Sequence, residues 1–168
     1  MKRIVSLVTA VTAVGAAAVA ALWLAVPAGA APTVRSAVSG TEHFQVMTTS
    51  ATATTLPIIA YGVFTAAGVD HMGSTVDKLV FPKGSFKVNH SKVTAKENFN
   101  PKTCLLTVSG TGKVTLFGGT GAYKGISGKP VATLSILAIA ASSRGKCSMT
   151  RPLVAFQQLI RAAGKITL

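Results

Sequence analysis

Hydrophobic and polar residues alternate in short segments through most of the chain beyond residue 40. The clearest segment runs from Gly84 to Ser91, where Phe86, Val88 and His90 share one face of an extended strand and polar residues occupy the other. Gly, Pro, Asn and Ser separate the segments, a pattern typical of antiparallel strands that bury one face. The sequence therefore predicts an all-β domain with Phe86, Val88 and His90 facing inward. The expected strands are 41–49, 55–66, 76–82, 84–91, 103–109, 112–117, 130–140 and one or two more within 153–168.

Two segments depart from simple alternation. Residues 131–140 (VATLSILAIA) are apolar on both faces, so we expect the core to cover one face and a neighbouring subunit or a flap to cover the other. Residues 152–163 place apolar side chains at helical spacing between Pro152 and Gly164, which locally predicts an amphipathic helix. A closing β-strand is the alternative for this segment.

Residues 1–30 have the order of a secretory signal peptide. Basic residues at positions 2 and 3 precede an apolar run from Ile4 to Val26, and Pro27 and Ala28-Gly29-Ala30 follow it. A retained membrane anchor is the competing interpretation, but Pro27 ends a helix and the small residues offer a cleavage site after Ala30. We therefore predict a secreted protein with an N-terminal lead over 31–40 and a single all-β domain over 41–168, whose number of strands suits either a closed β-barrel or a sandwich.

The chain is strongly basic, with 17 Lys and Arg against four Asp and Glu. Removal of Lys2 and Arg3 with the signal peptide leaves 15 − 4 = +11, an excess that favours anionic polymers or lipids. The lysines are scattered and almost no aromatic residues lie among them, so base stacking has little to work with. We therefore expect the basic residues to form a solvated protein surface. Binding to an anionic polymer or lipid surface is the alternative, and no specific nucleic-acid site is expected.

The two cysteines, Cys104 and Cys147, are expected to pair with each other in an exported chain. Neither has a second cysteine or a histidine at the spacing that metal ligands show, so a metal or catalytic thiol is the less favoured interpretation. His43, His71, His90 and Asp70 also lack the spacing of a metal motif. We therefore expect a disulfide and no metal site.

The glycine-rich stretch Phe117 to Pro130 (FGGTGAYKGISGKP) raises the question of phosphate binding. Its glycines do not fit the dinucleotide fingerprint, and Lys124 is followed by Gly125 rather than by the Ser or Thr of a P-loop. The stretch fits a connection between strands, with glycines at positions that need positive φ and with Tyr123 and Ile126 directed inward. No cofactor is therefore expected.

The segment GGTGAYKGISG resembles the glycine-rich signature of the dirigent and allene oxide cyclase-like β-barrels. The stretches GVDHMGSTVDKLVFPKGSFKVNHS, FNPKTCLLTVSGTGKVTLF and VAFQQLIRAAGKITL are similar to exported bacterial proteins with such a barrel. The resemblance implies an eight-stranded antiparallel barrel with an apolar interior, a strand rather than a helix near the C-terminus, and a trimer as in the plant relatives. It brings no catalytic set that can be placed residue by residue.

Few residues of the chain are suited to chemistry inside such a barrel. A cyclase confines a reactive lipid and stabilises charge with one carboxylate or water, and the candidates here are Glu42 and Asp70, with Asp77 nearby in sequence. The leading hypothesis is a non-catalytic barrel that binds a small apolar ligand or a surface partner. Its ligand site is expected to contain Phe86, Val88, His90, Tyr123 and Ile126.

The alternative hypothesis is a cyclase- or dirigent-like enzyme that guides cyclisation or coupling of a reactive intermediate. An inward-facing carboxylate with a raised pKa is the feature that favours this alternative.

Overall fold

The computed structural model describes residues 37–148 and 150–168, and most of these residues belong to β-strands. The predicted signal peptide, and the predicted lead as far as residue 36, lie outside the described residues. The elements are β1 (Ser39–Thr48), β2 (Thr55–Tyr61), β3 (Ala66–His71), β4 (Val76–Phe81), β5 (Gly84–Asn89), β6 (Thr94–Asn100), β7 (Leu105–Lys113), β8 (Thr115–Phe117), the 3-10 turn η1 (Gly121–Tyr123), β9 (Ser127–Gly128), β10 (Val131–Ile139), β11 (Ala141–Ser143), β12 (Lys146–Ser148) and β13 (Ala155–Thr167).

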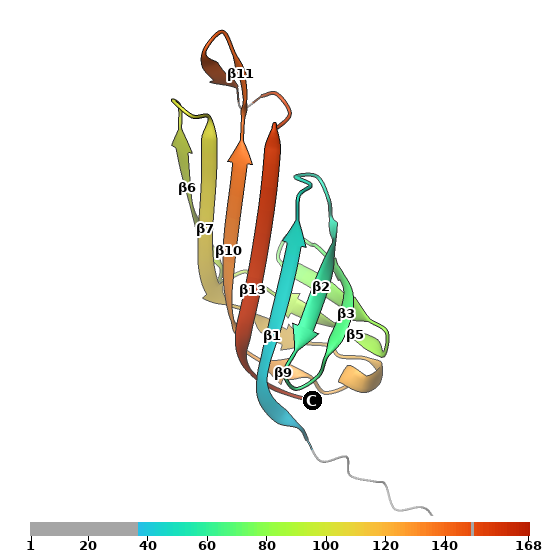
Figure 1. The fold of residues 1–168 in the computed structure, drawn as a ribbon. Coiled ribbons are helices and arrows are strands. Elements are labelled where there is room, and N and C mark those ends of the chain that lie inside the picture. Colours follow the sequence, from blue (N-terminus) through green and yellow to red (C-terminus); the bar gives the residue numbers. More distant parts are fainter. Residues whose placement is uncertain (1–36, 149) are drawn as a thin grey trace, which may run out of the picture. The chain divides into compact units, whose positions relative to one another are not determined.

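Eight of these strands close into an antiparallel barrel in the order β1-β2-β3-β4-β5-β8-β9-β13, with β13 pairing back onto β1 (Figure 1). Ten residue pairs join β1 to β13, from Ser39↔Thr167 to Thr48↔Gln158. Closure leaves no free strand edge within the ring. The predicted all-β fold with an eight-stranded antiparallel barrel is therefore confirmed.

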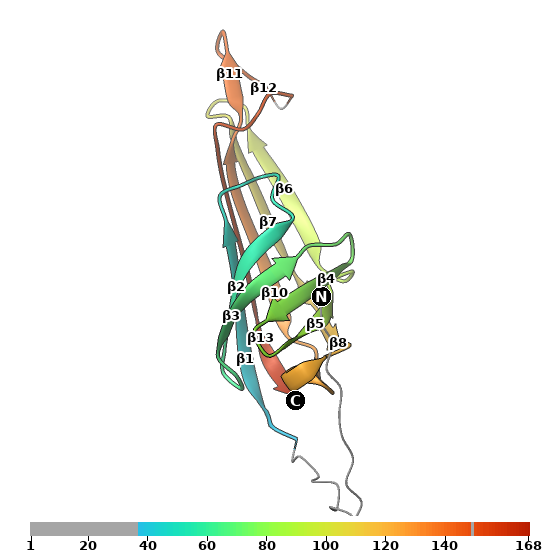
Figure 2. The same ribbon diagram turned by 90° about the vertical axis from the view of Figure 1, so that its right-hand side faces the viewer.

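The sheet also extends beyond the ring, because β13 is long enough to pair with two strands on the side opposite β1. Its last residues pair with β9 and its first part pairs with β10. Strands β7 and β6 continue from β10, so that β6, β7, β10 and β13 run side by side (Figures 1 and 2).

The interior of the barrel follows from the alternation along each strand. In β1 the side chains of Glu42, Phe44 and Val46 are buried and those between them are more exposed. In β5 the side chain of Phe86 is buried while Lys87 is exposed. The inward side chains form one core cluster that includes Phe44, Val46, Leu56, Ile58, Ala60, Leu79, Phe81, Phe86, Leu116, Tyr123, Ile126 and Ile166.

The glycine-rich connection from β8 to β9 closes one end of this core. Gly118 and Gly121 have φ of 66° and 58°, and a Cβ on Gly121 would come within 2.2 Å of the Lys83 carbonyl oxygen. Both positions favour glycine because their backbone is left-handed, and Gly121 also lies too close to another chain segment to carry a side chain. The turn directs Tyr123 and Ile126 into the core, where both are buried.

Several strand boundaries differ from those expected. The segment 55–66 was expected to be one strand, but it ends at Tyr61, and β3 follows a turn at Gly62 that brings residues 66–71 back alongside β2. Strand β6 was not expected, since it is polar and exposed and pairs only with β7. The segments expected at 103–109 and 112–117 correspond to β7 and β8, but β7 continues to Lys113 and β8 contains only the last three residues of the second segment, after a break at Val114.

The segment 152–163 forms a strand, not a helix, in β13 from Ala155 onward. Its partners β1 and β10 are each more than ten residues away in sequence, so their hydrogen bonds decide a conformation that the local pattern does not. None of the described residues lies in a helix that is long and apolar enough to cross a membrane.

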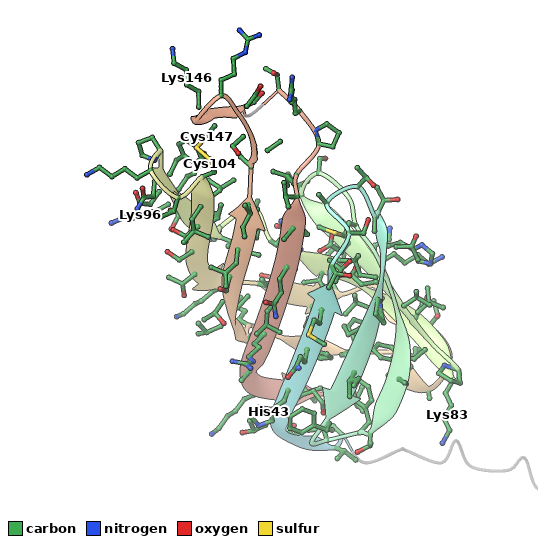
Figure 3. All side chains as sticks on the ribbon, turned by 45° about the horizontal axis from the view of Figure 1, so that its top comes forward. His43, Lys83, Lys96, Cys104, Lys146 and Cys147 are labelled. Carbon is green, nitrogen blue, oxygen red and sulfur yellow. A yellow bond between two sulfur atoms is a disulfide. The ribbon has the colours of Figure 1, made fainter. Side chains whose placement is uncertain are left out.

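The disulfide between Cys104 and Cys147 is present, as expected. It joins the turn between β6 and β7 to strand β12 of the β11–β12 hairpin (Figure 3). The bond therefore fastens this hairpin to the extended part of the sheet.

Candidate functional site: a cavity inside the barrel

A half-open cavity of about 300 Å³ lies between the inner faces of the barrel strands and the inner face of β10. It borders the core cluster, because Phe44, Val46, Ile58, Leu79 and Leu116 belong to both. Its other apolar side chains come mainly from β5, β10 and β13, and they include Val88, Val93, Val114, Leu134, Ile136, Ile160 and Ala162. The volume is at the lower end of the range for ligand sites, so the cavity suits a small and largely apolar molecule.

Aromatic rings pack the barrel interior beside this cavity. The ring centroids of Phe64 and Tyr123 are 4.8 Å apart, and those of Phe81 and Phe86 are 5.6 Å apart. Of the expected ligand-site residues, Val88 and His90 line the cavity. Phe86, Tyr123 and Ile126 lie in the core cluster and are not among the lining residues.

Asp70 is the polar residue that stands out in the cavity wall. Its side chain extends from β3 and is only 3% exposed, and its buried Oδ1 atom has no hydrogen-bond partner among the described residues. Burial, and secondly the nearby charge of Asp77, raise the pKa of Asp70 to about 7. Asp70 is therefore divided between its neutral and ionised forms near neutral pH.

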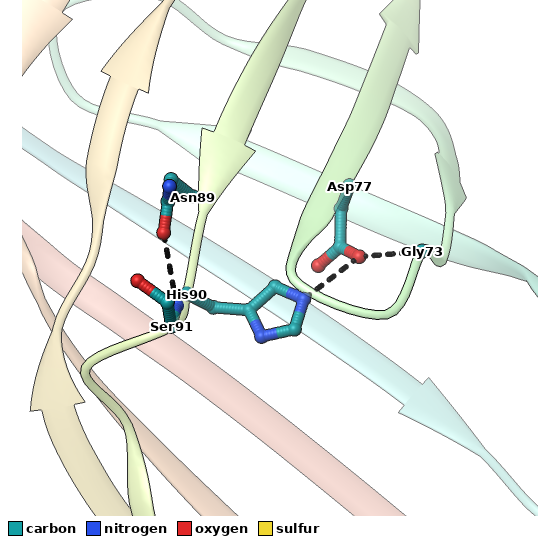
Figure 4. A network of polar contacts seen from close by, with 5 residues as sticks. All are labelled: Gly73, Asp77, Asn89, His90 and Ser91. Atoms are coloured by element: carbon teal, nitrogen blue, oxygen red, sulfur yellow. Dashed lines mark hydrogen bonds and ion pairs between the residues drawn. The ribbon is translucent and has the colours of Figure 1, made fainter.

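Asp77 and His90 form a pair (Figure 4). Both residues also line the cavity. The Nε2 atom of His90 lies 3.2 Å from Oδ1 of Asp77, and the same oxygen accepts a hydrogen bond of 2.8 Å from the backbone N–H of Gly73. The His90 side chain is 29% exposed, so this pair lies where the cavity approaches solvent. Unlike Asp70, Asp77 thus has its acceptor capacity partly filled by the protein.

Glu42, the other candidate carboxylate, lies elsewhere. Its side chain is fully buried and its Oε2 accepts a hydrogen bond of 3.0 Å from the Phe64 N–H, whereas its Oε1 has no partner within residues 37–148 and 150–168. Burial raises the pKa of Glu42, although the Phe64 and Val63 backbone N–H groups act against this. Burial and the charge of Glu42 in turn raise the pKa of Tyr123. Glu42 is not among the residues that line the cavity.

The four residues weighed as metal ligands do not come together. His43 stacks on Tyr61 with ring centroids 4.8 Å apart, and His71 contacts Thr55 on the exposed side of β2 and β3. Only Asp70 and His90 of this set line the cavity. Within residues 37–148 and 150–168 there is no group of three or more His, Cys, Asp or Glu that could hold a metal ion.

Basic side chains lie on the outside of the barrel. Every Lys and Arg among the described residues is exposed, and Lys83, Lys96 and Lys146 extend away from the strands (Figure 3). None of these cations lines the cavity, which in that part of the chain has Asp70, Asp77 and His90 as its ionisable groups.

The outer face of β10 carries exposed apolar side chains at both ends of the strand. Val131, Leu137 and Ile139 are 47%, 47% and 41% exposed, and no described segment covers them. The expectation that a neighbouring subunit covers this face, and the trimer implied by the resemblance, remain predictions.

Comparisons with protein-family models, with curated proteins and with solved structures gave no match to this chain. The resemblance to allene oxide cyclase-like barrels is therefore untested as a statement of family.

Sequence reasoning named Asp70 and His90 but did not place Asp77 or Gln158 in the site. Gln158 lines the cavity from β13 and is 9% exposed. The helical interpretation of 152–163 concealed its inward direction. For Asp77 a signal was available. It lies two residues before Leu79 in an alternating segment, so the two side chains share the face whose apolar residues point inward.

Proposed function

We propose that this protein is a secreted, non-catalytic barrel that binds a small apolar ligand carrying one polar group. The observation that carries the proposal is the cavity of about 300 Å³, whose wall is apolar apart from a few polar groups that include the unpartnered Asp70 carboxyl. Apolar walls supply affinity, and a few fixed polar groups orient the ligand.

The expected affinity follows from the size of the cavity. Each methylene removed from water contributes about 0.8 kcal/mol, and part of this gain offsets the cost of immobilising the ligand. A straight eight-carbon alcohol such as octanol should therefore bind with a dissociation constant in roughly the micromolar to millimolar range.

The test is titration calorimetry with octanol on two alanine variants of β13. Ala162 lines the cavity, whereas its neighbour Ala163 is exposed on the outer face. Ala162→Phe should weaken binding about tenfold or more, because its ring displaces the equivalent of two or more ligand methylenes. Ala163→Phe adds the same ring on the other face and should leave binding unchanged.

Circular dichroism should show that both variants are folded. If wild type shows no saturable binding, or if both variants bind octanol as wild type does, the cavity is not the ligand site. A surface partner would then be the better function for this barrel.

One observation favours the enzymatic alternative. Asp70 is an inward-facing carboxyl with a raised pKa, which is the feature expected of a cyclase-type general acid or base. Conversion of an unstable unsaturated epoxide to one cyclised stereoisomer by wild type, and its loss in Asp70→Asn, would establish that function. Binding of octanol without any such turnover supports the non-catalytic function.

A further inference from the structure

The acidic and basic residues of this protein are sorted between the inside and the outside of the barrel. Of its four acids, Asp70 and Asp77 line the cavity and Glu42 is buried in the core, which leaves only Glu97 exposed, on β6. The many Lys and Arg of the described residues are all exposed. A protein with a strong positive net charge thus has a cavity that Asp70 and Asp77 line and that no Lys or Arg of the described residues lines.

Among the described residues that line the cavity, Asp70 is the one with a buried side-chain oxygen that has no hydrogen-bond partner. A buried acceptor without a partner costs free energy, and the cost is larger when the acceptor is charged. Oδ1 of Asp70 is such an acceptor, and it belongs to a side chain that lines the cavity. A hydrogen-bond donor on a ligand would supply the partner that the protein does not.

Asp77 determines which kind of donor fits best. Its carboxylate is held by the Gly73 N–H and by His90, and it lies close enough to Asp70 for its charge to act there. Two carboxylates facing one low-dielectric cavity attract a cation and repel an anion. A fatty acid would place a third carboxylate beside them, whereas an ammonium group offers a positive charge and three N–H donors.

We propose that the cavity selects small apolar amines, whose ammonium group binds Asp70 while the hydrocarbon chain lies against Leu134, Ile136 and Ile160. This inference rests on the proposed ligand-binding function and specifies its ligand class. Asp77 contributes its charge without direct contact, and His90 holds Asp77 in place as a positioning residue.

The test compares octylamine, octanol and octanoate, which share one chain length and differ in the charge of the head group. Titration calorimetry at pH 8 should rank them amine, then alcohol, then carboxylate. We expect octylamine to bind at least about tenfold more tightly than octanol, because a charge-assisted hydrogen bond is roughly twice as strong as a neutral one. Octanoate should bind more weakly than octanol.

The matched variants are Asp70→Asn and Glu97→Gln, which each remove one negative charge. Glu97 lies on β6 outside the cavity wall. Asp70→Asn should remove most of the preference for octylamine while binding of octanol persists, and Glu97→Gln should bind all three probes as wild type does.

The pH dependence gives an independent readout. Asp70 ionises as the pH rises through about 7, with Asp77 and His90 the other ionisable groups in the cavity wall, while an alkylamine stays protonated until about pH 10. Affinity for octylamine should therefore rise between pH 6 and pH 8, and that rise should be absent in Asp70→Asn.

The outcomes separate the two claims. Equal binding of all three probes, or an octylamine preference that survives in folded Asp70→Asn, overturns amine selection and leaves the ligand-binding function in place. Failure of all three probes to bind wild type overturns both.

Discussion

Replacement of Asp70 by Asn is expected to stabilise the folded protein at pH 8 by about 4 kcal/mol relative to wild type. The pKa of Asp70 rises from 3.8 to about 7 on folding, a change of roughly three units at about 1.4 kcal/mol each. Because the folded state holds this proton more tightly, wild type loses stability as the pH rises from 3.8 to 7 and regains none above it. An amide does not ionise, so Asp70→Asn avoids this loss.

Urea denaturation of both proteins at a series of pH values measures this effect. The difference in the free energy of unfolding should be small near pH 4 and should grow to its full value by pH 8. Glu42, whose pKa burial also raises, is present in both proteins and cancels in the difference. Parallel pH profiles for wild type and Asp70→Asn would mean that the Asp70 carboxyl is solvated in the folded protein. Glu97→Gln, which also removes one negative charge, serves as the control.

Removal of the disulfide is the second change with a large expected effect. Cys104 and Cys147 are 43 residues apart. A cross-link over that span lowers the conformational entropy of the unfolded chain, which stabilises the folded state by about 4 kcal/mol in the loop-closure model. The double variant Cys104→Ala, Cys147→Ala should therefore unfold at a temperature roughly 10 to 20 °C lower than oxidised wild type.

Scanning calorimetry with and without reductant supplies the control for this prediction. Reductant should lower the melting temperature of wild type to about that of the double variant and should leave the variant unchanged. An unchanged melting temperature in the variant would mean that the β11–β12 hairpin detaches without affecting the barrel.

The interior of the barrel could be predicted where alternation was regular. Phe86 and Val88 on β5 face inward because strand geometry sends every second side chain to the same side. The turn at Gly118 to Ile126 was also recognisable, since its backbone conformation needs glycine at particular positions. In both cases local chemistry is sufficient to determine direction.

Other elements depend on distant partners and left weaker signals. Strand β6 is polar, and its conformation comes from pairing with β7. In β13 Gln158 faces the cavity while Leu159 faces outward, an inversion of hydrophobicity that suggests a helix when the segment is read alone. Pairing with β1 and β10 fixes this register, and a single sequence does not show which strands will pair.

The candidate site could be predicted only in part: Val88 and His90 line the cavity as expected, but Phe86, Tyr123 and Ile126 belong to the core cluster instead. Scarcity of acids made Asp70 a candidate, but nothing in the sequence shows that its Oδ1 lacks a partner or that basic residues avoid the cavity. Those properties arise only when β3, β4 and β5 lie side by side. The division of charge between inside and outside is therefore a property of the fold.

A crystal structure of the protein with bound octylamine tests the central claim most directly, because it locates the ligand. The account predicts the hydrocarbon chain inside the barrel against Leu134 and Ile160, with the amine nitrogen about 2.7 to 3.2 Å from a carboxylate oxygen of Asp70. Octylamine bound only on the outer face beside Leu137 and Ile139, or a barrel interior closed by side chains, would contradict it.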